Sequence, residues 1–155
     1  MIALTKKLVV LLSDNVDTLT KRSMEDIKKH GGTKTYRTLT DAQLYSRVAQ
    51  VYDQVDKWML GEIRKEDIKQ TFLAVGKRRR EEGFRVSEVI QALIIIRRHI
   101  WIFVDSENFF DTALDLHSAI DLINSTLVFF DRAIYFTSVG YENSARTVDP
   151  KLNPA

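Results

Sequence analysis

The sequence contains no cysteine, and its only two prolines lie within its last six residues. Without cysteine the chain can form no disulfide, zinc–thiolate site or thiol nucleophile, which is typical of proteins in a reducing compartment. We therefore expect a cytoplasmic protein. Glycine is also scarce, with six among 155 residues, so residues 1–149 contain little that interrupts a helix. The composition thus predicts an all-α fold.

Excess charge and long apolar runs are lacking as well. Lysine plus arginine exceed aspartate plus glutamate by 23 − 21 = +2, which gives no large positive field to attract nucleic acid. The N-terminal apolar run, residues 8–12, is shorter than that of a signal peptide. Residues 89–104 are apolar but interrupted by RRH, and they are fewer than the roughly 20 that a membrane helix needs. We expect a soluble protein that binds neither nucleic acid nor a membrane.

Apolar residues recur at helical spacing along the chain and predict a single-domain bundle of about five helices. The expected helices cover residues 4–29, 40–60, 62–83, 87–104 and 105–141. From residue 142 the composition becomes polar and includes proline, which is typical of a frayed terminus. We therefore divide the chain into one helical domain, residues 1–141, and a polar tail, residues 142–155.

Helix starts are predicted from side chains that can cap a free backbone amide. Thr40 followed by Gln43 matches a capping box, in which each side chain accepts a hydrogen bond from the other residue's backbone N–H. Ser87 is the expected N-cap of the fourth helix, and Asp105 or Ser106 that of the fifth. These caps set the expected boundaries of the second, fourth and fifth helices.

The last expected helix is apolar on two sides. Residues at steps of three and four form a heptad seam, which predicts that this face packs against another helix. The seam residues are Ala113, Leu116, Ile120, Ile123, Leu127, Phe130 and Ile134. A second apolar band lies away from the seam, and a helix of this kind is either central or at an interface. We therefore expect a homodimer. The interface candidates are Leu114, Leu122, Val128, Phe129 and Phe136.

Two rows of side chains flank the seam. On one flank, Ala119, Thr126 and Ala133 are small enough to allow a close backbone approach. On the other flank, polar side chains recur every seven residues, where they can line a cavity for an unknown small ligand. With two aromatic residues they make up the ligand-contact candidates His117, Asn124, Asp131, Tyr135 and Trp101. The alternative is a hydrogen-bonded row at the solvent edge of the core.

The segment GKRRREEGF, residues 76–84, closes the third expected helix, with Gly83 as its C′ residue. Its basic residues precede Glu81 and Glu82 by one helical turn, so the charges partly cancel. The segment also lacks the interleaved aromatics of a nucleic-acid surface. We interpret it as a basic helix end. The alternative is a nucleic-acid-binding regulator that uses residues Lys77–Arg80.

Three successive arginines point about 100° apart around a helix, so at least one is expected to face a neighbouring element. Arginine favours a bidentate bond to a carboxylate, and Glu88 and Asp131 are the candidate partners. We group the charged residues as an expected ion network or docking surface. Its members are Arg78, Arg79, Arg80, Glu81, Glu82, Glu88 and Glu142.

The sequence offers little that supports catalysis or a cofactor. There is no Glu-x-x-His motif of a di-iron bundle, no Gly-x-Ser-x-Gly elbow and no phosphate-binding glycine loop. His117 and Asp121 have the spacing of two metal ligands, but one pair is too few for a site. We expect no catalytic residue, no metal and no cofactor. The alternative is a metal- or haem-dependent sensor or small enzyme that uses His99 or His117.

Three blocks of the sequence are similar to the helical N-terminal domain of RsbT co-antagonist proteins of the RsbRD type. They are TYRTLTDAQLYSRVAQVYDQVDKWM (35–59), GKRRREEGFRVSEVIQALIIIRRHIW (76–101) and FFDRAIYFTSVGYE (129–142). Their order and spacing match the family, and the resemblance covers residues 35–142. The glycine-bounded basic block and the last block are the most specific in combination.

The resemblance implies a non-enzymatic input module of bacterial stress signalling that responds to an unknown small ligand or partner. Related stressosome sensor domains have a globin-like, haem-free fold and dimerise. In such proteins a STAS output domain follows, whereas this chain shows none after Glu142. The chain is therefore a stand-alone domain or a fragment, and its native-looking end favours the first. Output then passes through a protein partner that carries the output domain.

No catalytic role is implied for any residue that matches the family pattern. The apolar matches are explained by packing, and the charged ones fit an ion network or a docking surface. The matching residues are Tyr36, Leu44, Tyr45, Arg47, Trp58, Gly76, Arg78, Arg79, Glu81, Glu82, Gly83, Ser87, Glu88, Ala92, Leu93, Trp101, Phe130, Asp131, Ala133, Tyr135, Gly140, Tyr141 and Glu142.

Overall fold

The fold comes from a computed structural model, which describes residues 2–107, 109 and 116–148. These residues form six α-helices and one 3₁₀ helix, and they contain no strand. The helices are α1 (Ile2–Asp14), α2 (Val16–Lys29), η1 (Gly31–Thr38), α3 (Asp41–Met59), α4 (Lys65–Glu81), α5 (Val86–Ser106) and α6 (Leu116–Val148). The predicted all-α class is thus confirmed, although there are more helices than the five expected.

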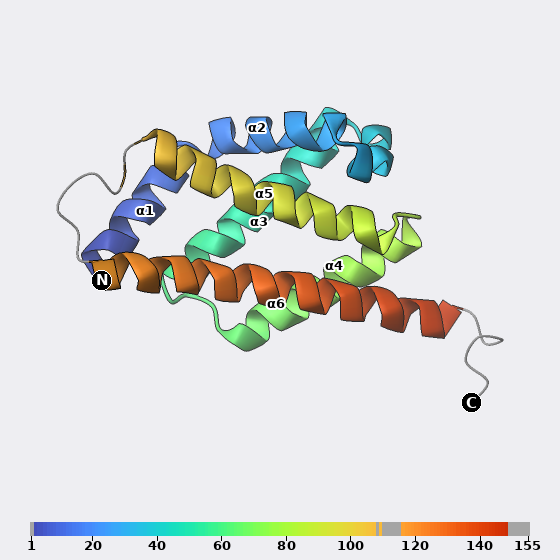
Figure 1. Cartoon of the computed structure of the whole chain (residues 1–155). Coiled ribbons are helices and arrows are strands. Elements are labelled where there is room, and N and C mark those ends of the chain that lie inside the picture. The colour runs from blue at the N-terminus through green and yellow to red at the C-terminus, as the bar shows by residue number, and fades with distance from the viewer. Residues whose placement is uncertain (1, 108, 110–115, 149–155) are drawn as a thin grey trace.

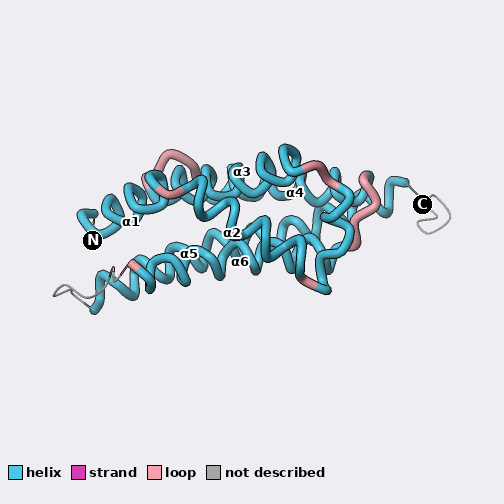
Figure 2. The backbone as a smooth tube through the Cα atoms, turned by 90° about the horizontal axis from the view of Figure 1, so that it is seen from above, coloured by secondary structure: helices cyan, strands magenta, loops and turns pink. Residues whose placement is uncertain are grey.

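The helices form two layers around one hydrophobic core. Helices α5 and α6 run side by side on one side, and α1, α3 and α4 lie on the other (Figures 1 and 2). Helix α2 lies against both α3 and α5 and covers one edge of the core. The longest helix, α6, packs mainly on α4. This arrangement places the middle of α3, the second half of α4 and the first half of α5 around a common interior space.

The extra helix arises at Asn15, where the single first helix expected over residues 4–29 is broken. Asn15 has φ −121° and ψ 16°, outside the helical region, and it separates α1 from α2. Its side-chain amide donates to the Leu11 carbonyl at 2.8 Å, which is the local competition with the helix ladder that asparagine favours. The break lets α1 and α2 take different directions (Figure 1).

Two of the predicted helix ends are confirmed and two are wrong. Thr40 and Gln43 make both bonds of the capping box, at 2.9 and 3.1 Å, and Gly83 ends its helix with φ +88°. The cap of α5 is Arg85 rather than Ser87, because the Glu88 carboxylate accepts from the Arg85 backbone N–H at 3.2 Å. Ser106, an expected cap of the last helix, is the final residue of α5.

The C-terminal boundary also differs from the expectation. Helix α6 continues through residue 142 to Val148, so the segment 142–148 is helical rather than a frayed tail. Residues 149–155, the rest of the expected tail, lie outside the described residues. The seven residues after Tyr141 contain one positive and one negative side chain and no proline, which a helix accommodates.

The apolar band of α6 that the sequence suggests for a dimer interface is largely buried within the chain. Leu122 and Phe129, expected at a dimer interface, are buried within the chain, and Phe129 makes edge-to-face contacts with Phe72 and Phe130 at centroid distances of 5.8 and 5.1 Å. Val128 and Phe136 are half-buried. Leu114, the remaining candidate, lies outside the described residues. Leu122 and Phe129 therefore belong to the core of one chain, and Phe136 packs against that core.

The heptad seam, by contrast, is exposed over its central part. Ile120, Ile123 and Leu127 are 46%, 36% and 37% exposed, and they lie at steps of three and four on one side of α6. We refer to these three residues as the exposed strip. Phe130 of the same seam is fully buried, while Ala113 lies outside the described residues. The described residues of this chain therefore do not bury the exposed strip, and its expected contact with another helix stays a prediction.

One acidic group in the contact between α1 and α3 is expected to make stability depend on pH. Ser13 Oγ donates to Asp56 Oδ2 at 3.1 Å, whereas the buried Oδ1 has no hydrogen bond within the described residues. Burial raises the pKa of Asp56 from 3.8 to about 6, with the Ser13 hydrogen bond opposing and the charge of Asp53 reinforcing this rise. The protonated carboxyl therefore stabilises the fold below pH 3.8, and this contribution is lost as the pH rises through 6.

We expect Asp56→Asn to raise the free energy of unfolding by on the order of 1 kcal/mol at about pH 8 and to change it little at about pH 5. The uncharged amide keeps the shape of the protonated acid and removes the half-buried charge. Urea denaturation at the two pH values measures the difference. Asp53→Asn, on the exposed side of the same helix, is the control, because Asp53 pairs with Lys57 at 2.9 Å in solvent. An equal effect of Asp56→Asn at both pH values would contradict the assignment.

Candidate functional site

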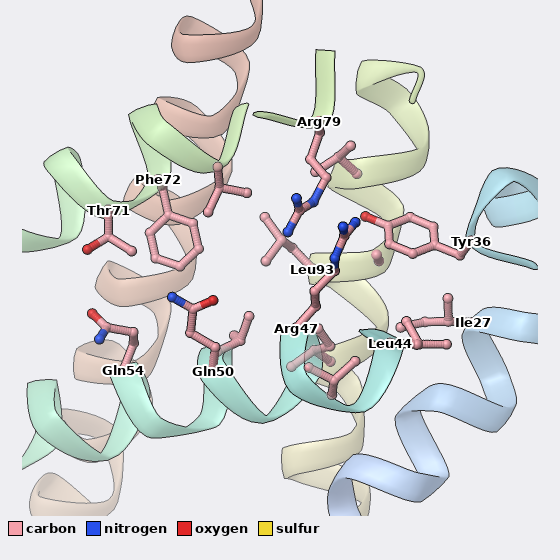
Figure 3. A pocket seen from close by; sticks show the side chains of 16 residues that line it. Ile27, Tyr36, Leu44, Arg47, Gln50, Gln54, Thr71, Phe72, Arg79 and Leu93 are labelled. Atoms are coloured by element: carbon pink, nitrogen blue, oxygen red, sulfur yellow. The ribbon is translucent and has the colours of Figure 1, made fainter. Parts of the chain in front are cut away.

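A pocket lies in the interior space between α3, α4 and α5, and Ile27 of α2 and Tyr36 of η1 close one end of it (Figure 3). Its volume is about 40 Å³. The lining residues are Ile27, Tyr36, Leu44, Arg47, Val48, Gln50, Val51, Gln54, Thr71, Phe72, Val75, Arg79, Val89, Ala92, Leu93 and Ile96. Most of them are buried and half of them are buried aliphatic residues, while Gln50 is exposed and marks the solvent side.

The lining follows from helical periodicity. In α3, Leu44, Val48 and Val51 recur at steps of four and three and turn one aliphatic face inward. The facing side of α5 contributes Val89, Ala92, Leu93 and Ile96 at the same spacing. Ala92 is the smallest side chain on that face, and its short side chain leaves space where the neighbouring positions fill it. The pocket therefore results from two apolar helix faces and the small side chain of Ala92.

One end of the pocket is cationic. Arg79, from the last turn of α4, and Arg47, from α3, direct their guanidinium groups toward one another in Figure 3. The Arg79 side chain is 9% exposed, and its Nη1 donates to Glu82 Oε1 at 2.6 Å. Arg47 Nη2 donates to the other oxygen, Glu82 Oε2. The two arginines thus share a single carboxylate.

The electrostatics of this end reflect that sharing. Burial lowers the pKa of Arg79, and the nearby positive charge of Arg47 lowers it further, against the opposing effect of Glu82. Burial alone would raise the pKa of Glu82, but the hydrogen bonds from Arg47 and Arg79 hold it below its usual value. Arg47 Nη1 is buried and makes no hydrogen bond within the described residues. A buried guanidinium nitrogen without an acceptor is costly, so this end of the pocket is suited to an additional anion.

Tyr36 completes the polar end. Its ring packs against that of Phe84, with the ring centroids 4.6 Å apart. Its hydroxyl points toward the two guanidinium groups (Figure 3). Burial raises the pKa of Tyr36 to about 12, and the positive charges of Arg79 and Arg47 oppose that rise. The hydroxyl therefore stays protonated at neutral pH and can donate a hydrogen bond.

Glu88 lies near the same end of the pocket, but its hydrogen bonds are to backbone amides rather than to the two arginines. Its carboxylate accepts from the Thr35 backbone N–H at 3.0 Å and from the Arg85 backbone N–H at 3.2 Å. Although burial acts in the opposite direction, these bonds keep the pKa of Glu88 below its usual value. Glu88 thus fixes the start of α5 against η1 and forms no ion pair with Arg79 in the described part of the chain.

The expected ion network is found in part. One of the three successive arginines, Arg79, does face inward, as helix geometry predicts, but its partner is Glu82 rather than Glu88 or Asp131. Arg80 lies over the ring of Tyr141 at 4.9 Å, and Arg78, Glu81 and Glu142 are exposed. The segment therefore presents Arg78 and Arg80 to solvent and Arg79 to the interior, as the expectation of at least one inward-facing arginine requires.

The ligand-contact candidates do not line this pocket. His117, Asn124, Asp131 and Tyr135 are exposed along one side of α6, and Trp101 is half-buried on α5. None of the five is among the residues that line the interior pocket. His117 Nε2 lies 3.4 Å from Asp121 Oδ2 at the surface. The positions fit the alternative of a polar row at the solvent edge, because the side of α6 that carries this row faces away from α4.

The histidines show no arrangement that favours a metal or haem. His99 Nε2 lies 2.9 Å from Asp26 Oδ2, where it joins α5 to α2, and neither His99 nor His117 lines the interior pocket. Among the described residues, no three acidic or histidine side chains gather in a way that could hold a metal ion. No helix in the described part of the chain meets the length and hydropathy of a membrane-crossing segment.

Arg47 and Tyr36 line the polar end of the pocket and are not among the binding residues predicted from the sequence. A signal for Arg47 is present, because it lies three residues after Leu44 and four before Val51, on the buried face of its helix. A basic residue at such a position predicts a buried charge that needs a partner. Tyr36 gives no such signal, since η1 has no regular apolar face.

Comparison with protein-family models and with curated proteins gives no match to this chain. The resemblance to RsbT co-antagonist domains and the globin-like fold that it implies therefore remain predictions.

Proposed function

We propose that the chain is a non-enzymatic sensory or regulatory domain, of the kind found in RsbT co-antagonist signalling, which binds a small ligand and acts through protein contacts in the cytoplasm. The observation that carries this proposal is the interior pocket, because two arginines that share one carboxylate lie at the end of a largely aliphatic chamber. Such a combination of apolar lining and a few polar groups is typical of ligand sites. The second guanidinium, that of Arg47, also has a buried nitrogen without an acceptor in the described residues, which supports a ligand at this end.

The position of the pocket supports a role in signalling. Its lining includes residues of α3, α4 and α5, and α4 packs closely on α6, the helix that carries the exposed strip. A ligand that changes the packing of Arg79 in α4 therefore acts on an element joined to the outer surface. The related stressosome domains, by resemblance, pass on their state through an output domain. Here that output domain is proposed to belong to a partner protein.

A homodimer is part of the proposal. The exposed strip of α6 has the steps of three and four that form a helix–helix seam, and a symmetric dimer uses the same patch from both copies. The interface is thus proposed on the strip rather than on the band expected from the sequence.

A charge introduced within the strip tests the dimer. We expect Leu127→Glu to convert a dimer into a monomer in size-exclusion chromatography with light scattering, because a glutamate at the seam would be buried against its own copy. Leu60→Glu is the control, since Leu60 is 46% exposed at the end of α3 and outside the strip. A wild-type chain that is monomeric at all concentrations would remove the dimer from the proposal.

Native mass spectrometry of freshly purified protein, followed by denaturation of the same sample, tests the sensory function. We expect extra mass that is released on denaturation or that appears when a small-molecule extract is added. A chain that retains no small molecule under either condition would contradict a ligand-binding function and leave a purely protein-binding one. Absorbance in the Soret region of the same sample tests the haem alternative.

A further inference from the structure

We infer that the interior pocket binds a small monocarboxylate of formate to propionate size, with its carboxylate at Arg47 and Arg79 and its alkyl group among the aliphatic side chains. This inference rests on the proposed function and names the ligand class of the same pocket.

The polar end has a guanidinium nitrogen that lacks an acceptor. Arg47 and Arg79 carry two positive charges and share the single carboxylate of Glu82, while the carboxylate of Glu88 is bound by two backbone amides. The Nη1 atom of Arg47 is buried without an acceptor in the described residues. An incoming anion supplies the missing acceptor, and in a site of low dielectric that hydrogen bond is worth more than in water.

The geometry favours a carboxylate among anions. A guanidinium group offers parallel N–H donors that match the two oxygens of a carboxylate, and here two such groups face each other (Figure 3). The protonated hydroxyl of Tyr36 points to the same place and can donate a third hydrogen bond. A spherical halide would use only part of this donor set.

The rest of the lining favours a ligand with a short alkyl group. The lining beyond the polar end includes the half-buried Gln54 and Thr71, and its buried part is bounded by Val48, Val51, Phe72, Leu93 and Ile96. These buried side chains offer no hydrogen bond to a phosphate, a sulfate or a second carboxylate, and burying such a group against them is unfavourable. A methyl or ethyl group fits them.

The volume limits the ligand's length. The pocket of about 40 Å³ is far smaller than the apolar cavity of about 150 Å³ that holds benzene in an engineered protein. Three to five non-hydrogen atoms are therefore an approximate upper size, which corresponds to formate, acetate or propionate. Longer acids such as hexanoate would need the helices to move apart.

A route for a charged ligand exists on the outer side of the same arginines. A shallow surface groove is lined by Ser46, Arg47, Gln50, Arg78, Arg79, Glu81 and Glu82. It shares Arg47, Gln50 and Arg79 with the interior pocket. An acid that approaches the exposed Arg78 can thus reach the buried guanidinium groups after Arg47 or Gln50 changes rotamer.

The test is a titration of the ¹⁵N-labelled full chain with sodium formate, acetate, propionate, butyrate and hexanoate, followed by amide chemical shifts. We expect saturable shifts in α3, α4 and α5 with a dissociation constant of about 1 mM for the best acid and at least about 10-fold weaker binding of hexanoate. Sodium chloride and the neutral analogue propionamide are expected to give no such shifts. The inference is overturned if chloride or propionamide produces the same shifts, or if none of the acids binds.

Arginine variants locate the binding. Arg47→Met is expected to weaken binding of the best acid at least about 10-fold, and Arg79→Lys, which keeps the charge but loses the planar fork, to weaken it several-fold. Arg78→Met is the matched control, because Arg78 is exposed, adjacent and equally charged, and its dissociation constant should change less than about twofold. An equal loss in Arg78→Met would show surface attraction only and would overturn the site.

The outcomes separate this inference from the proposed function. Propionamide binding in the pocket without any effect of the acids would remove the carboxylate class but keep a ligand-sensing domain. Absence of binding by every probe, together with bare protein in native mass spectrometry, would remove both.

Discussion

Replacing Gly140 with alanine is expected to lower the free energy of unfolding by about 2 kcal/mol or more. A Cβ atom at Gly140 would lie 2.9 Å from the Cα of Leu73 in α4 and closer still to the Leu73 carbonyl oxygen. These are backbone atoms, so the clash is relieved only if α4 and α6 separate. In an isolated helix the same change would add about 1 kcal/mol of stability. The sign of the effect therefore decides whether the two helices are in close contact.

Gly76 is the counterpart of Gly140 on α4, and its replacement by alanine is expected to have a similar effect. There a Cβ would lie 2.7 Å from the Tyr141 backbone nitrogen and closer to the Thr137 carbonyl oxygen. Gly31→Ala is the control, since no atom lies within 4 Å of the added Cβ, and it should change stability by less than about 0.5 kcal/mol. Denaturant unfolding measures all three. A Gly140→Ala variant as stable as the wild type would contradict the packing of α4 on α6.

Replacing Phe129 with alanine is expected to cost about 3–5 kcal/mol of unfolding free energy. Phe129 is fully buried between Phe72 and Phe130, so truncation removes its apolar contacts and leaves a cavity. Leu127→Ala, two residues earlier and 37% exposed, is the control and should cost about 1 kcal/mol or less. Unfolding by urea at low protein concentration keeps any dimer from contributing to the result.

The same pair of variants decides between the two sides of α6. If Phe129 belongs to the core of one chain, Phe129→Ala lowers the stability of the monomer by about 3–5 kcal/mol, and Leu127→Ala lowers it by about 1 kcal/mol or less. In the reverse pattern, Phe129→Ala would affect only the assembly state. The second apolar band would then form the dimer interface, as the sequence suggests. The position of the exposed strip would then be wrong as well.

Features set by local interactions are those that the sequence predicts well. The capping box at Thr40 and Gln43 and the positive φ of Gly83 depend on residues within one helical turn, so the pattern alone determines them. The all-α class follows from the scarcity of proline and glycine. The break at Asn15 is harder to predict from the sequence, because asparagine within an apolar helical pattern ends some helices and is tolerated in others.

The burial of α6 could not be predicted from its aliphatic pattern, since the helix is apolar on two sides. The small residues of the flank are the better guide, because Thr126 and Ala133 are buried, and glycine at position 140 brings the backbone of α6 against Leu73 of α4. Close helix packing selects small side chains, whereas an aliphatic seam packs equally well within a chain or between two copies. Which side of α6 is buried depends on the helix that packs against it, and the sequence does not identify that helix.

The candidate site depends on contacts between distant parts of the chain. Arg47 and Arg79 lie on different helices, and Tyr36 comes from the 3₁₀ segment η1. The sequence predicts that one of three arginines faces inward but not that a second arginine meets it. The sequence predicts ligand contact at the polar row of α6 instead, because the regular spacing of that row is visible in the sequence. Its residues do not line the interior pocket, although Asn124 lines a surface groove with Asp121 and Ser125.

The central claim, that the interior pocket holds a small ligand at Arg47 and Arg79, is tested most directly by intermolecular nuclear Overhauser effects between unlabelled propionate and ¹³C-labelled protein. The account predicts cross-peaks from the propionate methyl group to the methyl groups of Val51, Leu93 and Ile96, and their loss in Arg47→Met. Cross-peaks confined to the exposed strip of α6, or none at saturating propionate, would contradict it.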